Sequence, residues 1–572
     1  VLNRVLDHPD PRQPGLVERC VIRSPTLPIQ DPWLSGFTLN YYHFGFVTWA
    51  SVARMLGTPA AIAYNLAAAV IPGQVAACAY SMALLLTRSR SLACVSAIAL
   101  IGLGNLAGAQ QVASLGSAYD VWSPSRVIAG TINEFPFFTF FWADLHPHLM
   151  AMPNYLVFVA LALVAFDDRS ALSKRGRLVT FALLGASGGI AAATSPWDVL
   201  PLGVILATVL VARPGRLRPA SDALVFVVVA LAIVLPFVRT MDAGGVRAGV
   251  ATAHSPLAAF LLVQAPWILP PALLLGGTVK RWTAAALGVT ALVISLLSGS
   301  VTVAALTLLT ALAWDALRRT RQGTLLLIAP AVTMLLFAEL FYVDDLYGPS
   351  LERMNSVFKF HLHAILLMAV CAGSCLQALW EERHGAAFRG VVLATVGCAA
   401  LGAAVYPVGA VGAATSRALA PTLDGTRYLD AGDAEDAGDR ALIQFLTANV
   451  KGMPVIAEAT GGPYSYAARI SSNTGLPTVL GWANHERVWR RSAAAGEEIT
   501  RRAEAVRALY EESGPRAADV IREFHVRYVV VGGFERRQHP KGDFAKFEGL
   551  GRRVFENGGT ALFELGSAVT GP

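Results

Sequence analysis

The stretch FFWADLHPHLM, residues 140–150, sets a carboxylate and two imidazoles beside large apolar side chains. Asp144, His146 and His148 alternate along the chain, and alternate residues of an extended backbone point the same way. The three side chains can therefore bind one divalent ion, such as Mg²⁺ or Mn²⁺, with Glu134 as a further ligand. Two alternatives stay open. One is a polar role in a substrate pocket without a metal, because ionisable groups at membrane depth are usually functional. The other is a helix cap at Asp144 with the histidines at a membrane interface.

A second carboxylate lies in the first polar segment, where Asp31 is followed by Pro32 and Trp33. A carboxylate held by a proline turn beside an aromatic ring is a candidate general base. The alternative is an Asp-Pro turn that caps the following helix.

Cations mark a third segment, in which Arg353, Lys359 and His361 lie at the start of an apolar run. Arginine binds phosphate through a two-pronged contact and lysine binds it as a point charge, so this segment is a candidate site for a lipid phosphate. The alternatives are ion pairs with Asp345 or Glu352, or snorkelling to lipid headgroups.

The elements that must position these residues are apolar helices. The chain is 54% hydrophobic and 15% charged, whereas soluble domains are about 25% charged. Most of its apolar runs reach the roughly 17–25 residues that cross a hydrocarbon core of about 30 Å. The sequence therefore predicts a polytopic α-helical membrane protein with about twelve spans between residues 59 and 415. The runs are 59–87, 91–110, 149–166, 178–194, 197–212, 220–238, 256–279, 282–298, 300–314, 324–343, 360–380 and 388–411.

Basic residues fall in every second loop between these runs, a bias that marks short cytoplasmic loops. We therefore expect the alternate loops, the outer loop 1–58 and the domain 420–572 to be extracytoplasmic. Within the outer loop, residues 39–56 are predicted to form an amphipathic helix along the membrane interface, where tyrosine and tryptophan are favoured. The chain starts at Val1, and we expect at least one membrane helix before it. The basic loops are 88–90, 169–177, 213–218, 280–281, 318–321 and 383–389.

Residues 420–572 are polar and turn-rich and are predicted to form a soluble α/β domain, with strands at 453–459 and 525–535. Within it, His485 and Glu486 are candidate substrate-binding residues, and the alternative is an ordinary amphipathic surface. No GxGxxG or Walker pattern occurs in the sequence, which argues against nucleotide hydrolysis. The net charge of +7 is accounted for by the basic loops and requires no nucleic acid.

Four motifs in order resemble the YYY-domain membrane proteins, the family DUF2298: DPWLSGFTLNYYHFG, TINEFPFFTFFWADLHPHL, ERMNSVFKFHLHA and NTGLPTVLGWANHERVWR. The tyrosine triplet of that family is here Tyr41-Tyr42-His43, so His43 need not play the part of the third tyrosine. The family is similar in layout to the polytopic GT-C glycosyltransferases, which use a lipid-phosphate-linked sugar and carry a catalytic carboxylate in the first outer loop. The resemblance implies a catalytic role for Asp31 and a donor-phosphate site at Arg353 and Lys359.

The expected function is an integral membrane glycosyltransferase that moves a sugar from a polyprenyl-phosphate donor to an acceptor at the extracytoplasmic face of the plasma membrane. Asp31 would deprotonate the acceptor, and Asp144, His146 and His148 would offset the leaving charge with or without a divalent ion. A lipid or polar-solute transporter and a metal-dependent hydrolase at the membrane surface are the alternatives. Scarce charges at the span centres disfavour the transporter. The other predicted substrate-binding residues are Tyr41, Tyr42, His43, Arg126, Glu134, Arg353, Lys359, His361, His485 and Glu486.

Overall fold

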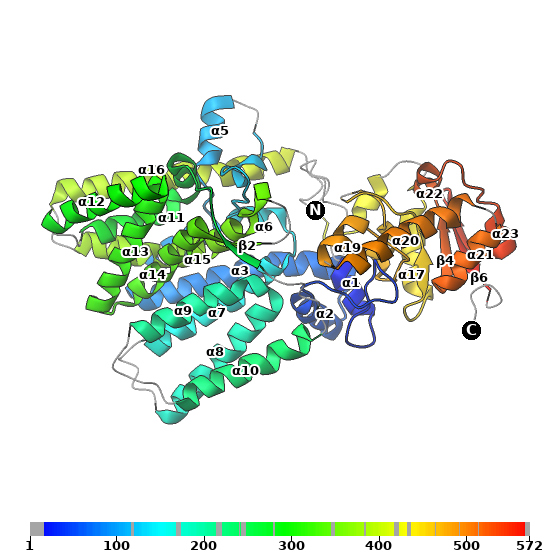
Figure 1. Cartoon of the computed structure of the whole chain (residues 1–572), viewed down its shortest axis with the longest axis horizontal. Coiled ribbons are helices and arrows are strands. Elements are labelled where there is room, and N and C mark those ends of the chain that lie inside the picture. The colour runs from blue at the N-terminus through cyan, green and yellow to red at the C-terminus, as the bar shows by residue number, and fades with distance from the viewer. Residues whose placement is uncertain are drawn as a thin grey trace. The chain divides into compact units, whose positions relative to one another are not determined.

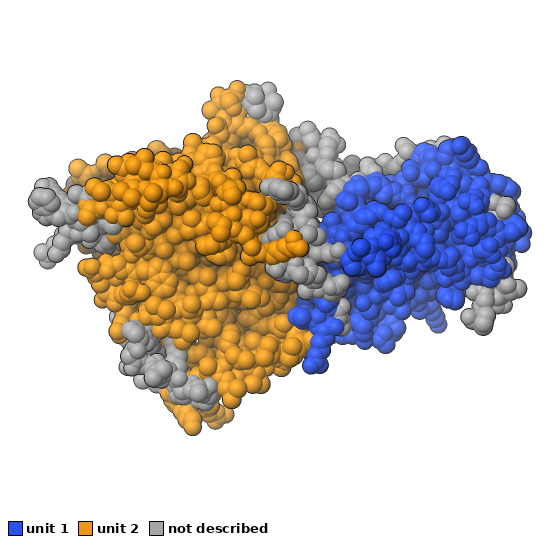
Figure 2. Space-filling view, viewed as in Figure 1, with its two compact units in different colours: residues 1–68, 236–244, 419–572 blue, residues 69–235, 245–418 orange. Residues whose placement is uncertain are grey.

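The computed structural model divides into two compact units, each described here by itself (Figures 1 and 2). Unit 1 comprises residues 1–68, 236–244 and 419–572, and unit 2 comprises residues 69–235 and 245–418. The structure describes residues 16–115, 119–166, 173–212, 220–239, 241, 247–277, 281–344, 349–381, 385–416, 422–431, 436–463, 465–490, 492–512 and 514–566. Asp345 and parts of four predicted basic loops lie outside the described residues.

Unit 2 is a bundle of apolar helices, and each of the twelve predicted runs contains one. Within the described residues, eight helices are long and apolar enough to cross a membrane, and α4, α9, α10 and α12 are shorter over their apolar parts. The prediction of a polytopic helical membrane protein is confirmed. The helices are α3 (Ala60–Thr87), α4 (Arg90–Ile101), α5 (Ala107–Leu115), α6 (Pro136–Trp142), α7 (Pro147–Phe166), α8 (Lys174–Thr194), α9 (Val199–Val211), α10 (Ala220–Val238), α11 (Leu257–Gly277), α12 (Arg281–Ser298), α13 (Val301–Thr320), α14 (Gly323–Leu340), α15 (Met354–Glu381) and α16 (Ala386–Ser416).

Helix α15 is the centre of unit 2. It packs against α14, α4 and α11, and 83% of its apolar window is buried, against 22% for α16. A membrane helix needs no protein around its apolar side chains, so this burial means that helices rather than lipid surround α15. Polar groups near its first turns therefore face protein, where partners can satisfy them. A two-stranded antiparallel sheet pairs β1 (Arg247–Val250), which precedes α11 in the chain, with β2 (Phe341–Asp344), which precedes α15.

The predicted run 91–110 differs from the structure, because α4 ends at Ile101 and α5 begins at Ala107. Twelve residues of α-helix extend ~18 Å, which is less than the hydrocarbon core. The backbone between the two helices bonds to neighbouring helices: Gly104 N–H donates to Ala403 O and Leu106 N–H to Leu262 O. Irregular backbone at membrane depth is tolerated where protein satisfies it, so one predicted span is in fact a short helix with an irregular extension.

Unit 1 contains a four-stranded sheet of order β3-β4-β6-β5, formed by β3 (Val455–Ala457), β4 (Val526–Val531), β5 (Gly551–Asn557) and β6 (Thr560–Leu565). β3 and β4 are parallel, and the β4–β6 and β5–β6 pairs are antiparallel. The predicted α/β character is confirmed. The helices of this unit are α1 (Leu16–Arg23), α2 (Phe44–Leu56), α17 (Asp439–Asn449), α18 (Arg469–Thr474), α19 (Ala483–Trp489), α20 (Ala493–Glu511), α21 (Gly514–Glu523), α22 (Gly533–Gln538) and α23 (Lys546–Leu550).

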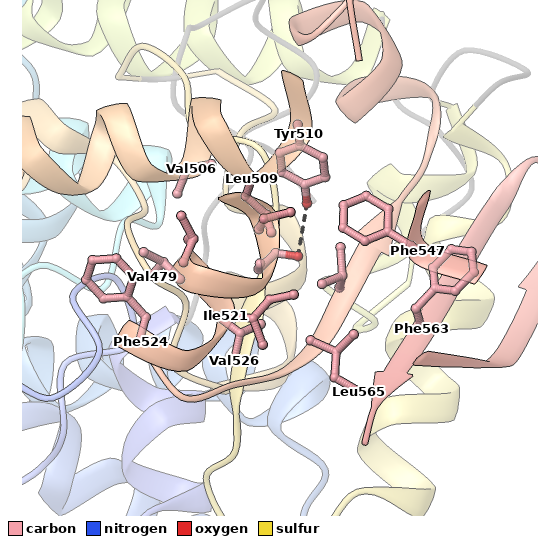
Figure 3. Packing of buried hydrophobic residues seen from close by; sticks show 14 of the residues in the cluster. Val479, Val506, Leu509, Tyr510, Ile521, Phe524, Val526, Phe547, Phe563 and Leu565 are labelled. Atoms are coloured by element: carbon pink, nitrogen blue, oxygen red, sulfur yellow. Dashed lines mark hydrogen bonds between the residues drawn. The ribbon is translucent and has the colours of Figure 1, made fainter. Parts of the chain in front are cut away.

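The sheet core is built from one face of β4 and β6 and the apolar faces of α20 and α21 (Figure 3). The Tyr510 hydroxyl of α20 is buried among these residues and lies within hydrogen-bond distance of Ala457 O (3.1 Å) and Val530 O (2.9 Å). A buried hydroxyl needs such a partner, so Tyr510 links α20 to two adjacent strands.

The first described segment, residues 16–58, folds with the C-terminal domain rather than apart from it. Helix α1 packs against α18. Thr478 N–H donates to Pro32 O (2.9 Å), and Gly481 N–H donates to Trp33 O (2.8 Å). The expected helix within 39–56 is present as α2, and its location at a membrane interface stays a prediction.

Candidate functional site

The first turn of α7 and the second turn of α15 meet through two polar side chains. Lys359 Nζ lies 3.2 Å from Nδ1 of His148, and both side chains are buried. An ammonium group only donates, so Nδ1 of His148 accepts and the imidazole proton resides on Nε2. Nε2 faces the Glu134 carboxylate at 3.7 Å. Pro147 occupies the first position of α7, where its missing N–H costs nothing.

Glu134 lies in the loop before α6 and is largely buried. Its Oε2 accepts a hydrogen bond from Thr139 Oγ1 at 3.3 Å. Burial raises the pKa of Glu134, and the positive charges of Lys359 and Arg126 lower it. Arg126 stacks over Trp122, with the guanidinium carbon 4.4 Å from the ring centroid. Arg126, Glu134, His148 and Lys359 therefore form one electrostatically linked cluster, which we call the lysine cluster.

Asp144 and His146 lie beside the lysine cluster but remain open to solvent. Their side chains are 57% and 45% exposed, and Nδ1 of His146 is 3.2 Å from Asp144 Oδ2. The His146 ring centroid is 5.1 Å from that of His148. Ala143, at φ +52°, ends α6 in the left-handed region and turns the chain between the two helices. The pair has the geometry of an imidazole oriented by a carboxylate.

The three predicted metal ligands are not gathered as a set. His148 turns inward to Lys359, whereas Asp144 and His146 face outward. A cation 3.2 Å from a proposed ligand nitrogen disfavours a second cation there. Among the described residues, no group of three or more His, Cys, Asp or Glu side chains is arranged to hold a metal ion. The donor set does not fit the predicted ion, and the use of a metal stays an untested prediction.

Arg353 differs from expectation, because it is buried and paired inside unit 2. Its Nη2 is 2.9 Å from Glu339 Oε1, and its guanidinium also donates to Ala253 O and Ala338 O. Glu339 in turn accepts from the Ser255 N–H and hydroxyl. The predicted phosphate contact of Arg353 is not supported by this geometry. Its partner is Glu339, rather than Glu352.

Two further residues of α15 point elsewhere. His361 is fully buried, and neither of its ring nitrogens has a hydrogen-bond partner among the described residues. His363 Nε2 lies 3.4 Å from Asp198 Oδ1, and its Nδ1 lies 2.6 Å from Lys359 O. Asp198 occupies the N-cap position of α9, but its side chain makes no capping bond to that helix. The sequence signal for the buried pair of Asp198 and His363 is a single aspartate between two apolar runs.

Asp31 lies in unit 1 and is fully buried. It accepts the Trp33 N–H at 2.9 Å and Arg490 Nη2 at 2.8 Å, and Arg490 also bonds Glu486. Burial raises the pKa of Asp31, which the Arg490 charge opposes. Burial and then the charge of Asp31 raise the pKa of Glu486 well above its ordinary value. The structure has the Asp-Pro turn rather than an accessible general base.

The remaining predicted residues of unit 1 belong to an aromatic cluster. Tyr41 is 5.5 Å from Tyr42 and 4.8 Å from Trp489 between ring centroids. His485 lies 4.9 Å from Trp482, and His43 Nδ1 is 2.9 Å from Tyr41 O. The predicted set is thus divided between the two units, and its convergence in one cavity stays a prediction.

These features define a polytopic helical membrane protein with an additional α/β unit. The sequence family described as "Uncharacterized membrane protein (DUF2298)" matches residues 18–368, and the chain belongs to this family. No curated protein matches the chain.

Two solved structures are similar to the chain. ArnT from Cupriavidus metallidurans, bound to undecaprenyl phosphate, is 13% identical, with a TM-score of 0.45 over 99% of this chain and 95% of its own. The archaeal oligosaccharyltransferase AglB from Archaeoglobus fulgidus, in complex with an inhibitory peptide and a dolichol-phosphate, is 12% identical, with a TM-score of 0.41 over 90% of this chain and 64% of its own. At these scores the likeness is one of general layout.

Proposed function

We propose that this protein is a membrane glycosyltransferase that takes its sugar from a polyprenyl-phosphate donor. The observation that carries the proposal is the contact of Lys359 with His148 near the N-termini of two helices of a membrane bundle, next to the exposed Asp144–His146 pair. The lysine cluster would bind the anionic phosphate. The exposed pair would supply the base.

The electrostatics of the lysine cluster favour an anion. Helix N-termini carry partial positive charge and bind phosphate groups well, and α7 begins here at Pro147. Lys359 and Arg126 both act electrostatically on Glu134, whose pKa burial raises, and the Asp144 carboxylate also acts on it. The two cations of the lysine cluster would bind the phosphate oxygens. A lysine held at the start of a membrane helix suits the phosphate of a lipid whose chain lies in the bilayer.

The chemistry would be a single displacement. An acceptor hydroxyl oxygen attacks the anomeric carbon, and the bond from that carbon to the phosphate oxygen breaks with inversion. The hydroxyl proton passes to Nε2 of His146, whose Nδ1 faces Asp144. The lipid phosphate leaves as an anion beside Lys359, where the ammonium stabilises the developing charge. This assignment replaces the buried Asp31 as the base.

We place the reaction on the extracytoplasmic side of the plasma membrane. The support is the alternation of basic and acidic loops along the sequence, since Arg126, Glu134 and Asp144 lie between runs whose other ends carry the basic loops. The identities of the sugar and of its acceptor are to be determined by experiment.

The test is transfer by the full chain in proteoliposomes supplied with a panel of polyprenyl-phosphate hexoses and pentoses. The measurement is polyprenyl phosphate released in the presence of the host membrane extract as acceptor source. We expect one donor to be consumed, and Asp144→Asn and His146→Gln to slow its consumption by about 10²–10⁴-fold, the usual worth of general base catalysis. Asp315→Asn, an exposed aspartate paired with Arg319 on α13, is the matched control. Undiminished consumption by His146→Gln would remove it as the base.

A further inference from the structure

A groove of about 430 Å³ lies in unit 2 beside α5. Helix α5 lines it with Gln110, Gln111 and Ser114, and the turn that follows adds Ser123. The opposite wall comes from α11, through Ala259 and Leu262. The volume falls within the roughly 300–1,000 Å³ of small-molecule sites.

The lining chemistry selects an uncharged polar ligand. Four of the nine lining residues carry amide or hydroxyl groups, and none is charged. A phosphate or carboxylate would find no cation in this lining, and an acyl chain would offer no hydrogen-bonding group to the Gln110 amide. A sugar fits both parts of the lining, because its hydroxyls form hydrogen bonds while its C–H faces pack on apolar side chains.

Gln111 holds the groove in shape. Its Nε2 donates to Ser123 Oγ at 2.8 Å, and its Oε1 accepts the Asp120 N–H at 3.0 Å. Asn105 fixes the same turn through a 2.6 Å bond from Nδ2 to Pro124 O. Gln110, by contrast, is exposed, and its amide has no hydrogen-bond partner within the described part of the chain. The turn at Ser123 is thus held in place, and the Gln110 amide is available for a ligand.

The groove shares a folded loop with two members of the lysine cluster, Arg126 and Glu134. Ser125 O accepts the Asn133 N–H at 2.8 Å, and Asn133 Oδ1 accepts the Ile128 N–H at 2.7 Å. Arg126, next to the groove turn, interacts electrostatically with Glu134. A sugar in the groove would therefore lie on the same loop as Arg126 and Glu134.

From this geometry we infer that the groove binds the uncharged sugar end of the acceptor. This inference rests on the proposed function and deepens it, since the lysine cluster takes the charged donor and the groove takes a neutral glycoside.

The experiment uses the full chain in lipid nanodiscs, which avoids glycoside detergents. Saturation-transfer NMR is recorded with methyl glucoside, methyl galactoside and methyl mannoside, and with methyl glucuronide as the charged counterpart. We expect transfer to at least one neutral glycoside and a weaker signal from the glucuronide. Gln110→Leu and the groove-filling Ala259→Trp should each lower the neutral signal at least five-fold. The matched control is Gln322→Leu, an exposed glutamine at the start of α14.

Polyprenyl phosphate binding by native mass spectrometry is measured on the same samples. Unchanged binding together with a lost glycoside signal supports the acceptor site. Equal glycoside signals in the wild type and both groove variants would overturn it, and so would an acyl lipid that copurifies with the wild type and is displaced by Ala259→Trp. Failure of the wild type to bind polyprenyl phosphate would instead count against the proposed function.

Discussion

Lys359 Nζ contacts Nδ1 of His148 across 211 positions of sequence. The contact joins the first turn of α7 to the second turn of α15 and brings a buried ammonium next to a neutral imidazole. A buried lysine needs a carboxylate or a ligand anion near it to compensate for its lost hydration. Glu134 is one such carboxylate, since its charge and that of Lys359 interact.

Replacing Lys359 with Gln should weaken binding of polyprenyl phosphate by about 10- to 100-fold, the worth of a charge-assisted hydrogen bond of about 1.5–3 kcal/mol. The measurement is native mass spectrometry titration of the full chain with polyprenyl phosphate. Lys174→Gln, which removes an exposed lysine at the start of α8, should leave binding unchanged. Equal binding by both variants would show that Lys359 does not bind the phosphate.

Arg353 should act on stability rather than on phosphate binding. Its guanidinium pairs with buried Glu339 and with backbone carbonyls, so Arg353→Met leaves a buried charge without its partner and should cost about 3–5 kcal/mol. The double variant Arg353→Met, Glu339→Gln should recover part of this loss, because no unpaired charge remains. Thermal denaturation followed by fluorescence size-exclusion chromatography ranks the stabilities of the wild type, the single variant and the double variant. A fully stable Arg353→Met with lost phosphate binding would restore the predicted donor site.

Ionisation of Glu486 should make unit 1 less stable as the pH rises. Its pKa is raised in the folded state by burial and by the charge of Asp31, so the folded state binds the proton more tightly than the unfolded state does. Its stabilising contribution is therefore complete below the unfolded value of 4.5 and is lost as the pH rises through the higher folded value. Hydrogen exchange of α19, corrected for intrinsic rates, should show protection that declines with pH.

Glu486→Gln mimics the protonated acid and keeps an acceptor for Arg490, so the decline should be absent in this variant. Glu497→Gln, at an exposed position of α20, should keep the wild-type profile. Identical profiles for the wild type and Glu486→Gln would mean that Glu486 is already ionised in the folded protein.

The sequence predicted the helices of the bundle better than it predicted the contacts within the candidate site. Apolar runs predict spans because lipid forces the backbone to satisfy itself within a helix, and each run contains a helix. The exception is 91–110, where α4 ends at Ile101 and the N–H groups of Gly104 and Leu106 donate to Ala403 O and Leu262 O in place of helical partners. Because those partners lie far along the chain, no local sequence pattern predicts these hydrogen bonds. The β5–β6 hairpin was likewise missed, although Gly558 and Gly559, both at positive φ, are a typical hairpin turn.

Within the candidate site, the sequence predicted those features that neighbouring residues alone determine. The Asp-Pro turn at Asp31 is set by neighbouring residues, as the Trp33 N–H contact shows. Pairings such as Arg353 with Glu339 depend on which helices meet, and Glu339 lies inside a run that reads as apolar. Asp144 faces solvent and His148 faces the interior because α7 begins between them, at Pro147. The prediction assumed an extended backbone over this stretch and therefore placed both side chains on one side.

The packing of Trp33 on Gly481 gives a direct test of unit 1. Gly481 N–H donates to Trp33 O, and a Cβ on Gly481 would overlap the Trp33 ring. Gly481→Ala should therefore destabilise the unit by about 1–3 kcal/mol, as overpacking does, and should expose residues 16–58 to protease. Gly496→Ala on α20, where a Cβ meets no atom within 4 Å, should be neutral or stabilising because alanine favours helix. Limited proteolysis of the full chain, with the fragments identified by mass spectrometry, compares the two. If Gly481→Ala resists protease as well as Gly496→Ala does, residues 16–58 are not anchored through Trp33.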